Sequence, residues 1–417
     1  MDTAAPDSTE TPARGRRWIR RFVTAAGGLV ILAALVMGWI AYQRRPPAAM
    51  PPIRWRQETP GLQSLLGTVT PDGIFIGGTA EVVTAWDRDG RVLWQFTNGP
   101  SLGSVVVGPR GDLFLGGYRQ GTRRLVCLDA QGRFRWDQRA AVIDGIPPTV
   151  LPDGSLVTSG TDRELHAFSP GGKPLWTRDV QSASYGPPVV LSGGSLAVLG
   201  PTPGPGLMVV ASDGTPRGPF CSEHFDQEPS LRLATGGPDD TLYLAGNGTN
   251  FLRAVSRGGS VRWTVATDLD ATSKPVLSPA GRLLVTGRNA FTEQFELVAV
   301  SNAGAIVWRR NLGLPYADLP PAIGHDGSIY LTTGEPALWC LDPSGGIRWK
   351  YRLPRPIQWA PPARNSVSAW TTWVRQLLRT PRNISRTPLW ISADGSLRVG
   401  LSGPQGYLLC IERPSGR

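Results

Sequence analysis

The sequence predicts an all-β chain folded as an eight-bladed β-propeller, and three observations support this fold class. A turn motif rich in Asp and Gly returns about every 40 residues, a period typical of propeller blades. A second motif, built around tryptophan, returns at the same period. The 417 residues include 51 Gly and 39 Pro and only 18% charged residues, which fits short strands joined by tight turns.

The turn motif stands before a short apolar or alternating run, such as Ile74 to Ile76 or Ser328 to Leu331. Asp-Gly between such runs predicts a hairpin, because Gly accepts the positive φ that a tight turn requires. We therefore expect a strand after each copy. The copies are Pro71-Asp72-Gly73, Pro109-Arg110-Gly111, Pro152-Asp153-Gly154, Ser192-Gly193-Gly194, Pro238-Asp239-Asp240, Pro279-Ala280-Gly281, His325-Asp326-Gly327 and Ala393-Asp394-Gly395.

The tryptophan motif consists of a small residue, an Asp or Ser two positions later, a Gly after three more and a Trp after a further four. Ala85, Asp87, Gly90 and Trp94 form the first copy. The small residue allows blades to approach, the Asp or Ser bonds backbone within its turn, and the Trp fills the space between blades. Complete copies end at Trp94, Trp136, Trp176, Trp263, Trp308 and Trp349.

The fourth copy of the tryptophan motif is degenerate. We assign Ala211 and Asp213 to its first two positions, which puts Pro216 at the Gly position and Phe220 at the Trp position. Because it lacks the docking Trp, we expect the fourth blade to be the weakest of the ring.

The two ends of the chain carry complementary parts of one blade. An eighth copy begins at Cys410 and Glu412 but stops at Arg417 before any Trp, whereas Trp55 stands ahead of the first repeat. A ring in which the N-terminal strand completes the last blade explains both observations, and such closure removes exposed sheet edges. We therefore predict eight blades over residues 53–417, with seven as the alternative.

The spacing Ala-x-Asp-x-x-Gly-x-x-x-Trp resembles the docking motif of the PQQ-like (quinoprotein-type) β-propeller family, where PQQ is pyrroloquinoline quinone. The resemblance covers Pro52 to Arg417 and implies that Trp55 and the six tryptophans above dock neighbouring blades. The family includes dehydrogenases that hold PQQ over calcium, and binding scaffolds such as the propeller lipoprotein of the outer-membrane β-barrel assembly machinery. The fold alone does not choose between these functions.

An uncharged, largely apolar run extends from Phe22 to Gln43, and about 20 apolar residues suffice to span a bilayer. Five arginines precede this run and only two directly follow it, which predicts a cytoplasmic N-terminus. We expect a basic cytoplasmic tail over 1–21, a single-pass transmembrane signal anchor over 22–43 and a proline-rich spacer over 44–52. The expected location is the bacterial inner membrane with the propeller outside the cytoplasm, and the alternative is a cleaved signal peptide.

No motif predicts a catalytic or metal site. The cysteines Cys127, Cys221, Cys340 and Cys410 form no CxxC, CxxCH or adjacent pair, so the spacings of zinc, c-type haem and dithiol sites are absent. Many PQQ alcohol dehydrogenases of the family carry an adjacent Cys-Cys pair, which this chain lacks. The acids outside the repeat motifs are interpreted as a solvated rim: Glu81, Glu164, Glu223, Asp226, Glu228, Asp268 and Asp270.

The three histidines are isolated in the sequence. We interpret His166 and His325 as structural and His224 as the only histidine with acidic neighbours. The net charge of +11 comes mostly from scattered arginines, which does not indicate a nucleic-acid partner.

Residues 354–391 form an insertion, because the 68 residues between Gly327 and Gly395 exceed the repeat by roughly 25. A helix is expected from Asn365 or Ser366 to about Thr380. Its apolar face could pack on the propeller, or the helix could contact the membrane surface or a partner protein. The candidate contact residues are Trp370, Trp373, Arg375 and Arg379.

These observations predict a non-enzymatic periplasmic or extracytoplasmic propeller that acts as a protein-binding or scaffolding module at the membrane. The expected partner is another envelope protein, and no cofactor is predicted. The alternative is a PQQ-dependent oxidoreductase, which would require PQQ with calcium.

Overall fold

The computed structural model divides into two compact units, residues 1–48 and 49–417. The structure describes residues 52–59, 67–78, 82–97, 101–119, 121–140, 146–180, 187–199, 207–219, 231–246, 250–271, 273–313, 320–333, 337–353, 389–401 and 407–412. The predicted anchor, residues 22–43, lies outside these ranges. Within them, no helix has both the length and the hydropathy needed to cross a bilayer.

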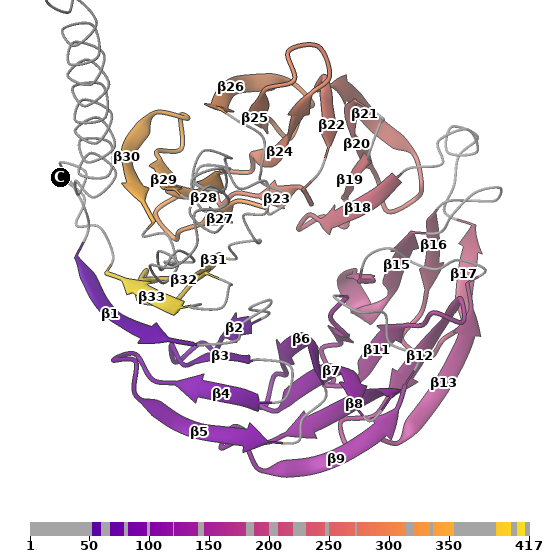
Figure 1. The fold of residues 1–417 in the computed structure, drawn as a ribbon. Coiled ribbons are helices and arrows are strands. Elements are labelled where there is room, and N and C mark those ends of the chain that lie inside the picture. The colour runs from indigo at the N-terminus through magenta and orange to yellow at the C-terminus, as the bar shows by residue number, and fades with distance from the viewer. Residues whose placement is uncertain are drawn as a thin grey trace, which may run out of the picture. The chain divides into compact units, whose positions relative to one another are not determined.

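The second unit is an all-β eight-bladed propeller, as the repeats predicted, and its antiparallel sheets follow one another in chain order (Figure 1). Blade 1 contains β2 (Gly67–Val69), β3 (Phe75–Gly78), β4 (Val82–Trp86) and β5 (Val92–Thr97). Blade 2 contains β6 (Ser101–Val107), β7 (Leu113–Arg119), β8 (Thr122–Leu128) and β9 (Phe134–Arg139). Blade 3 contains β10 (Thr149–Val150), β11 (Leu156–Ser159), β12 (Glu164–Phe168) and β13 (Pro174–Asp179).

The next three blades repeat this order. Blade 4 contains β14 (Val189–Val190), the short helix η1 (Ser192–Gly194), β15 (Leu196–Leu199), β16 (Leu207–Val210) and β17 (Pro216–Pro219). Blade 5 contains β18 (Leu231–Gly236), β19 (Leu242–Gly246), β20 (Phe251–Val255) and β21 (Val261–Ala266). Blade 6 has a fifth strand and contains β22 (Leu269–Ala271), β23 (Val276–Leu277), β24 (Leu283–Asn289), β25 (Phe295–Val300) and β26 (Ile306–Gly313).

The last two blades complete the ring. Blade 7 contains β27 (Ala322–Ile323), β28 (Ile329–Thr333), β29 (Ala337–Leu341) and β30 (Ile347–Arg352). Blade 8 contains β31 (Leu389–Ile391), β32 (Leu397–Leu401) and β33 (Tyr407–Ile411), and its fourth strand is β1 (Ile53–Glu58). β1 pairs antiparallel with β33, with Trp55 opposite Cys410, so the N-terminal strand completes the last blade as expected.

β31 also changes one boundary, because the insertion expected over 354–391 ends earlier. Its last three residues, Leu389–Ile391, are the first strand of blade 8. Residues 354–388, including the expected helix, lie outside the described residues.

The turn motif forms the first turn of each blade, and the tryptophan motif forms the third turn of blades 1 to 7. In blade 1, Gly73 and Gly90 have φ of 84° and 81°, a conformation that favours glycine. The Asp87 carboxylate accepts the backbone N–H groups of Asp89 and Arg91 at 2.9 and 2.8 Å, which holds the third turn. In an antiparallel sheet of four strands, the first and third turns lie at one end and the second hairpin lies at the other.

The hydrophobic core lies between neighbouring blades. Ile76 and Ala85 of blade 1 pack against Leu113, Leu115 and Val126 of blade 2 in one buried cluster, and similar clusters recur around the chain. Burial of these aliphatic faces holds each blade against the next, because apolar area leaves water.

Candidate functional site

The predicted docking tryptophans lie where blades meet. Six of their rings pack on the third-turn glycine of the following blade, so closely that an added Cβ would come within 2.4 to 2.7 Å of the ring. Each indole Nε1 donates to a backbone carbonyl of the same turn, at 2.7 to 3.2 Å. These six residues are Trp55, Trp94, Trp136, Trp176, Trp263 and Trp308.

Trp349 stands at the junction of blades 7 and 8. Its ring packs against a buried cluster that contains Tyr330 of blade 7 and Leu397 of blade 8. Its Nε1 has no hydrogen-bond partner among the described residues, and residues 413–417, which follow β33, lie outside them.

The strand register of blade 4 shows that the fourth tryptophan motif was assigned two residues too far along the chain. In blade 3, Ala167 pairs with Trp176 and Phe168 with Pro174. In blade 4, Val210 pairs with Pro216, which makes Val209 and Gly218 the equivalents of the small residue and the Trp. Gly214 is the docking glycine, because its φ is 83° and the Trp176 ring packs on it. The position expected at Phe220 is therefore occupied by Gly218, and Phe220 itself lies outside the described residues.

A polar contact joins blades 4 and 5. The backbone N–H of Ser192 donates to Asp240 Oδ1 at 2.6 Å, and its hydroxyl donates to the other carboxylate oxygen. Arg257 Nη1 lies 2.9 Å from Ser192 Oγ and 3.2 Å from Asp240 Oδ2. The hydrogen bond from Ser192 and the nearby Arg257 lower the pKa of Asp240 although burial opposes this shift. This blade clamp (Ser192, Asp240 and Arg257) ties together the two blades between which the strand register offers no Trp.

Blade 8 buries an arginine at the position that pairs with the small residue of the tryptophan motif, where the other blades carry uncharged, mostly apolar side chains. Arg398 is 0% exposed and pairs with Cys410, the small residue of the last motif. Its Nη1 donates to Ser396 Oγ at 2.9 Å, and its guanidinium carbon lies 5.1 Å from the centroid of the Trp55 ring. Its Nε and Nη2 atoms have no hydrogen-bond partner among the described residues. The equivalents are Ile76, Phe114, Val157, Ala197, Tyr243, Leu284 and Tyr330.

Three cysteines are free and buried, in agreement with their interpretation as small apolar residues. Burial raises the pKa of Cys127 to about 12 and that of Cys340 to about 11, so both thiols stay protonated at neutral pH. Since the thiolate is the nucleophile and metal ligand, these two residues are unsuited to either role.

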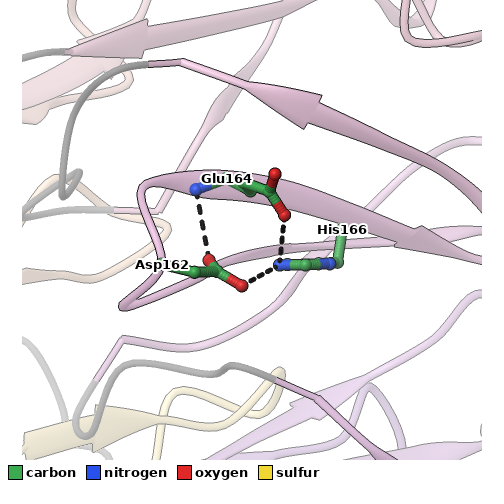
Figure 2. Close-up of side chains that lie close together, drawn as sticks. All are labelled: Asp162, Glu164 and His166. Atoms are coloured by element: carbon green, nitrogen blue, oxygen red, sulfur yellow. Dashed lines mark hydrogen bonds and ion pairs between the residues drawn. The ribbon is translucent and has the colours of Figure 1, made fainter.

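A cluster of three potential ligand side chains lies at the second hairpin of blade 3, between β11 and β12 (Figure 2). The donor atoms of Asp162, Glu164 and His166 all lie within 4.8 Å of one another. His166 Nε2 lies 2.8 Å from Asp162 Oδ2 and 3.8 Å from Glu164 Oε2. Of the residues that the structure describes, no others gather three His, Cys, Asp or Glu donors in this way.

The hairpin backbone positions these three side chains. Glu164 and His166 are two residues apart on β12 and therefore point to the same side of the strand. Arg163 takes a left-handed conformation with φ of 71°, which brings the Asp162 carboxylate back over the strand, where Oδ1 accepts the Glu164 N–H at 3.2 Å. An added Cβ at Gly160 would lie 2.0 Å from Asp162 Oδ1 and 3.0 Å from His166 Nε2, so the glycine keeps this space open.

The sequence interpretation missed this cluster. His166 was assigned a structural role, and His224 was taken as the only histidine with acidic neighbours, which is wrong because His166 contacts two acids. The pattern Glu-x-His could have revealed two of its three residues, since alternate residues of a strand share a face.

Most of the other candidate residues lie elsewhere. His325 lies in the exposed first turn of blade 7, and Asp268 pairs with Arg309 at 2.9 Å. Outside the described residues lie Glu81, Cys221, Glu223, His224, Asp226, Glu228, Trp370, Trp373, Arg375 and Arg379.

Calcium, which PQQ dehydrogenases use, takes six to eight oxygen ligands, whereas the one set of three converging His, Cys, Asp or Glu donors in the described ranges offers two carboxylates and one imidazole. Cys127, Cys340 and Cys410 stand in three different blades, so none can form the adjacent disulfide of the alcohol dehydrogenases.

Comparisons with known proteins agree with the repeat pattern. A family model described as outer membrane protein assembly factor BamB matches residues 79–143 and 293–372. The crystal structure of BamB from Moraxella catarrhalis is similar with a TM-score of 0.59 and 13% identity, covering 87% of this chain and 100% of that one. No curated protein sequence matches the chain.

The same fold occurs in propellers of other families. The C-terminal WD40 domain of Sif2 gives a TM-score of 0.63 at 10% identity, covering 87% of this chain and 98% of that domain. Saccharomyces cerevisiae Sqt1 gives 0.60 at 9% identity, with 87% and 98% covered. These identities show the fold alone, whereas the family model responds to the repeat sequence. The docking tryptophans, together with the match of residues 79–143 and 293–372 to that model, support a PQQ-like β-propeller.

Proposed function

We propose that this chain is a non-enzymatic scaffold, a propeller that binds another envelope protein at the outer side of the bacterial inner membrane. The observation that carries the proposal is the match to the model of an outer membrane assembly factor, joined to likeness with a BamB structure over that protein's whole length. Residues 22–43 would hold the chain in the membrane as a single-pass anchor. The segment 354–388 would provide a further contact with the membrane or the partner.

The outermost strands offer a surface for such a partner. Blades 1 to 3 expose large apolar side chains just before their docking Trp, and Leu93, Phe134 and Leu175 are 49%, 54% and 51% exposed. We call these three residues the apolar rim. The corresponding strands of blades 6 and 7 expose Val307 and Ile347 less, at 44% and 40%. Exposed apolar side chains that gather on one region are typical of interaction surfaces.

Affinity purification of the full-length chain from detergent-solubilised membranes, followed by mass spectrometry, tests the proposal. We expect one reproducible partner, and we expect the triple variant Leu93→Asn, Phe134→Asn, Leu175→Asn to lose it at an unchanged melting temperature. The matched control is Val307→Asn with Ile347→Asn, which should retain the partner. A wild-type chain that purifies alone, or a control that loses the partner while the rim variant keeps it, would contradict the proposal.

The rival function is PQQ-dependent oxidation. Adding PQQ and Ca²⁺ to the purified chain and following dye reduction with alcohols and sugars separates the two functions. We expect no turnover, whereas calcium-dependent turnover with stoichiometric PQQ binding would favour the oxidoreductase.

A further inference from the structure

We propose that Asp162, Glu164 and His166 bind a divalent transition-metal cation, with Zn²⁺ as the best fit. The donor set of one imidazole nitrogen and two carboxylate oxygens suits this class of cation, because imidazole is a ligand for zinc, copper and nickel and a poor one for calcium or magnesium. Three protein ligands would leave one position of a tetrahedral site for water or for a donor from another molecule.

The distances allow the site to form with small side-chain movements. With bonds of about 2.1 Å, two ligand atoms of a tetrahedral zinc site lie about 3.4 Å apart. The separations from His166 Nε2 are 2.8 Å to Asp162 and 3.8 Å to Glu164, on either side of that value. Gly160 leaves room at the point where the three side chains meet, since a Cβ there would collide with Asp162.

The second nitrogen of His166 also has a suitable partner. Thr177 of β13 places its Oγ1 3.4 Å from His166 Nδ1. When Nε2 binds a metal, the ring proton stands on Nδ1, and a hydrogen bond from Nδ1 fixes both the tautomer and the ring orientation. This partner lies outside the cluster and on a different strand, so the sheet itself holds the ring.

The charge balance points to a cation as well. The protein has a net charge of +11, and several acids of other turns pair with arginine, as Asp239 does with Arg262 at 2.6 Å. Among the described residues, His166 is the only basic side chain within ion-pair distance of Asp162 or Glu164. Two carboxylates beside one imidazole therefore carry negative charge that a divalent cation would neutralise.

The test is isothermal titration calorimetry of the full-length chain, purified without a histidine tag, with Zn²⁺ after removal of bound metal. We expect one equivalent of saturable Zn²⁺ binding, a rise in melting temperature with Zn²⁺, and no response to Ca²⁺ or Mg²⁺. Glu164→Gln keeps the contact between His166 and Asp162, so it should fold normally yet bind Zn²⁺ at least about tenfold more weakly. His166→Ala should also lose binding.

The matched controls are His224→Ala and His325→Ala, which remove the two other histidines and should bind Zn²⁺ as the wild type does. The proposal is overturned if the wild type shows no saturable binding or if Glu164→Gln and His166→Ala bind as tightly as the wild type. Loss of the site in His224→Ala, or equal binding of Ca²⁺, would overturn it too. A readout of metal binding keeps this test independent of partner binding.

Discussion

Replacing the buried Arg398 by methionine should stabilise the propeller. Each buried donor left without a hydrogen bond costs about 1–3 kcal/mol. Two guanidinium nitrogens of Arg398, Nε and Nη2, lack a hydrogen-bond partner among the described residues. The contact with the Trp55 ring returns about 2 kcal/mol. Burial also lowers the pKa of Arg398, which shows that the site disfavours the charge.

Methionine is unbranched and flexible like arginine but shorter and uncharged, and the other seven blades carry uncharged side chains at the equivalent position. Ser396, which loses one donor, keeps its bonds to Asp394 through both its N–H and its hydroxyl. Replacing a buried ion pair by apolar side chains of similar volume is neutral or stabilising by about 1–4 kcal/mol, and because Arg398→Met also removes two donors without partners, we expect it in this range.

Equilibrium urea unfolding followed by tryptophan fluorescence measures the effect as a shift in midpoint. The matched control is Phe114→Met in blade 2, which replaces an aromatic ring 6.0 Å from the Trp136 centroid and should destabilise by about 1 kcal/mol. An Arg398→Met midpoint that falls as far as that of Phe114→Met would refute the reasoning. It would mean that the guanidinium is fully hydrogen-bonded in its site.

Three further predictions concern the junctions between blades. Gly132→Ala should lower the melting temperature more than Gly111→Ala, because both glycines have positive φ but only Gly132 has a Trp ring within 2.4 Å of the new Cβ. The additional loss of folding free energy should be about 1–3 kcal/mol, and equal losses in the two variants would contradict docking of Trp94 on Gly132. Asp240→Asn should destabilise the chain at pH 7, because the lowered pKa of Asp240 stabilises the folded state while its carboxylate is ionised. Its deficit against the wild type should shrink as the pH falls from 3.8 toward the lower folded-state pKa, and a deficit that stays constant down to pH 2 would disprove this. Amide hydrogen exchange should be faster in residues 207–219 of blade 4 than in residues 165–179 of blade 3, since Gly218 stands at the position where other blades carry the docking Trp. Equal or slower exchange in residues 207–219 would contradict the expectation that blade 4 is the weakest blade.

The repeat made the fold predictable because every blade carries the same turn and docking residues at the same spacing. Turn glycines with positive φ and tryptophans at fixed spacing mark the blades, and the unmatched Trp55 and Cys410 indicate how the ring closes. The fourth copy was misplaced because it lacks both the turn Asp and the Trp, so its surviving Ala-x-Asp matched in the wrong register. Only the pairing of Val210 with Pro216 fixes the true one.

The features that escaped prediction depend on contacts between strands. Arg398 occupies a position that the motifs leave free, so only the sheet register shows that it replaces an apolar side chain. The proximity of His166 and Glu164 could be predicted, because the two residues share one face of the same strand. The contribution of Asp162 required the left-handed turn at Arg163, a conformation that residues other than glycine rarely adopt and that sequence does not indicate.

Site-specific photocrosslinking in living cells tests the binding role most directly. A photoreactive phenylalanine analogue at Phe134 or at Leu175 should crosslink to the same partner protein, because both positions lie on the apolar rim. The same analogue at Arg262, on the outermost strand of blade 5, should give no such adduct although its side chain is 48% exposed. Absence of a discrete adduct from both rim positions, or equal adducts from all three, would contradict a propeller that works by binding a partner.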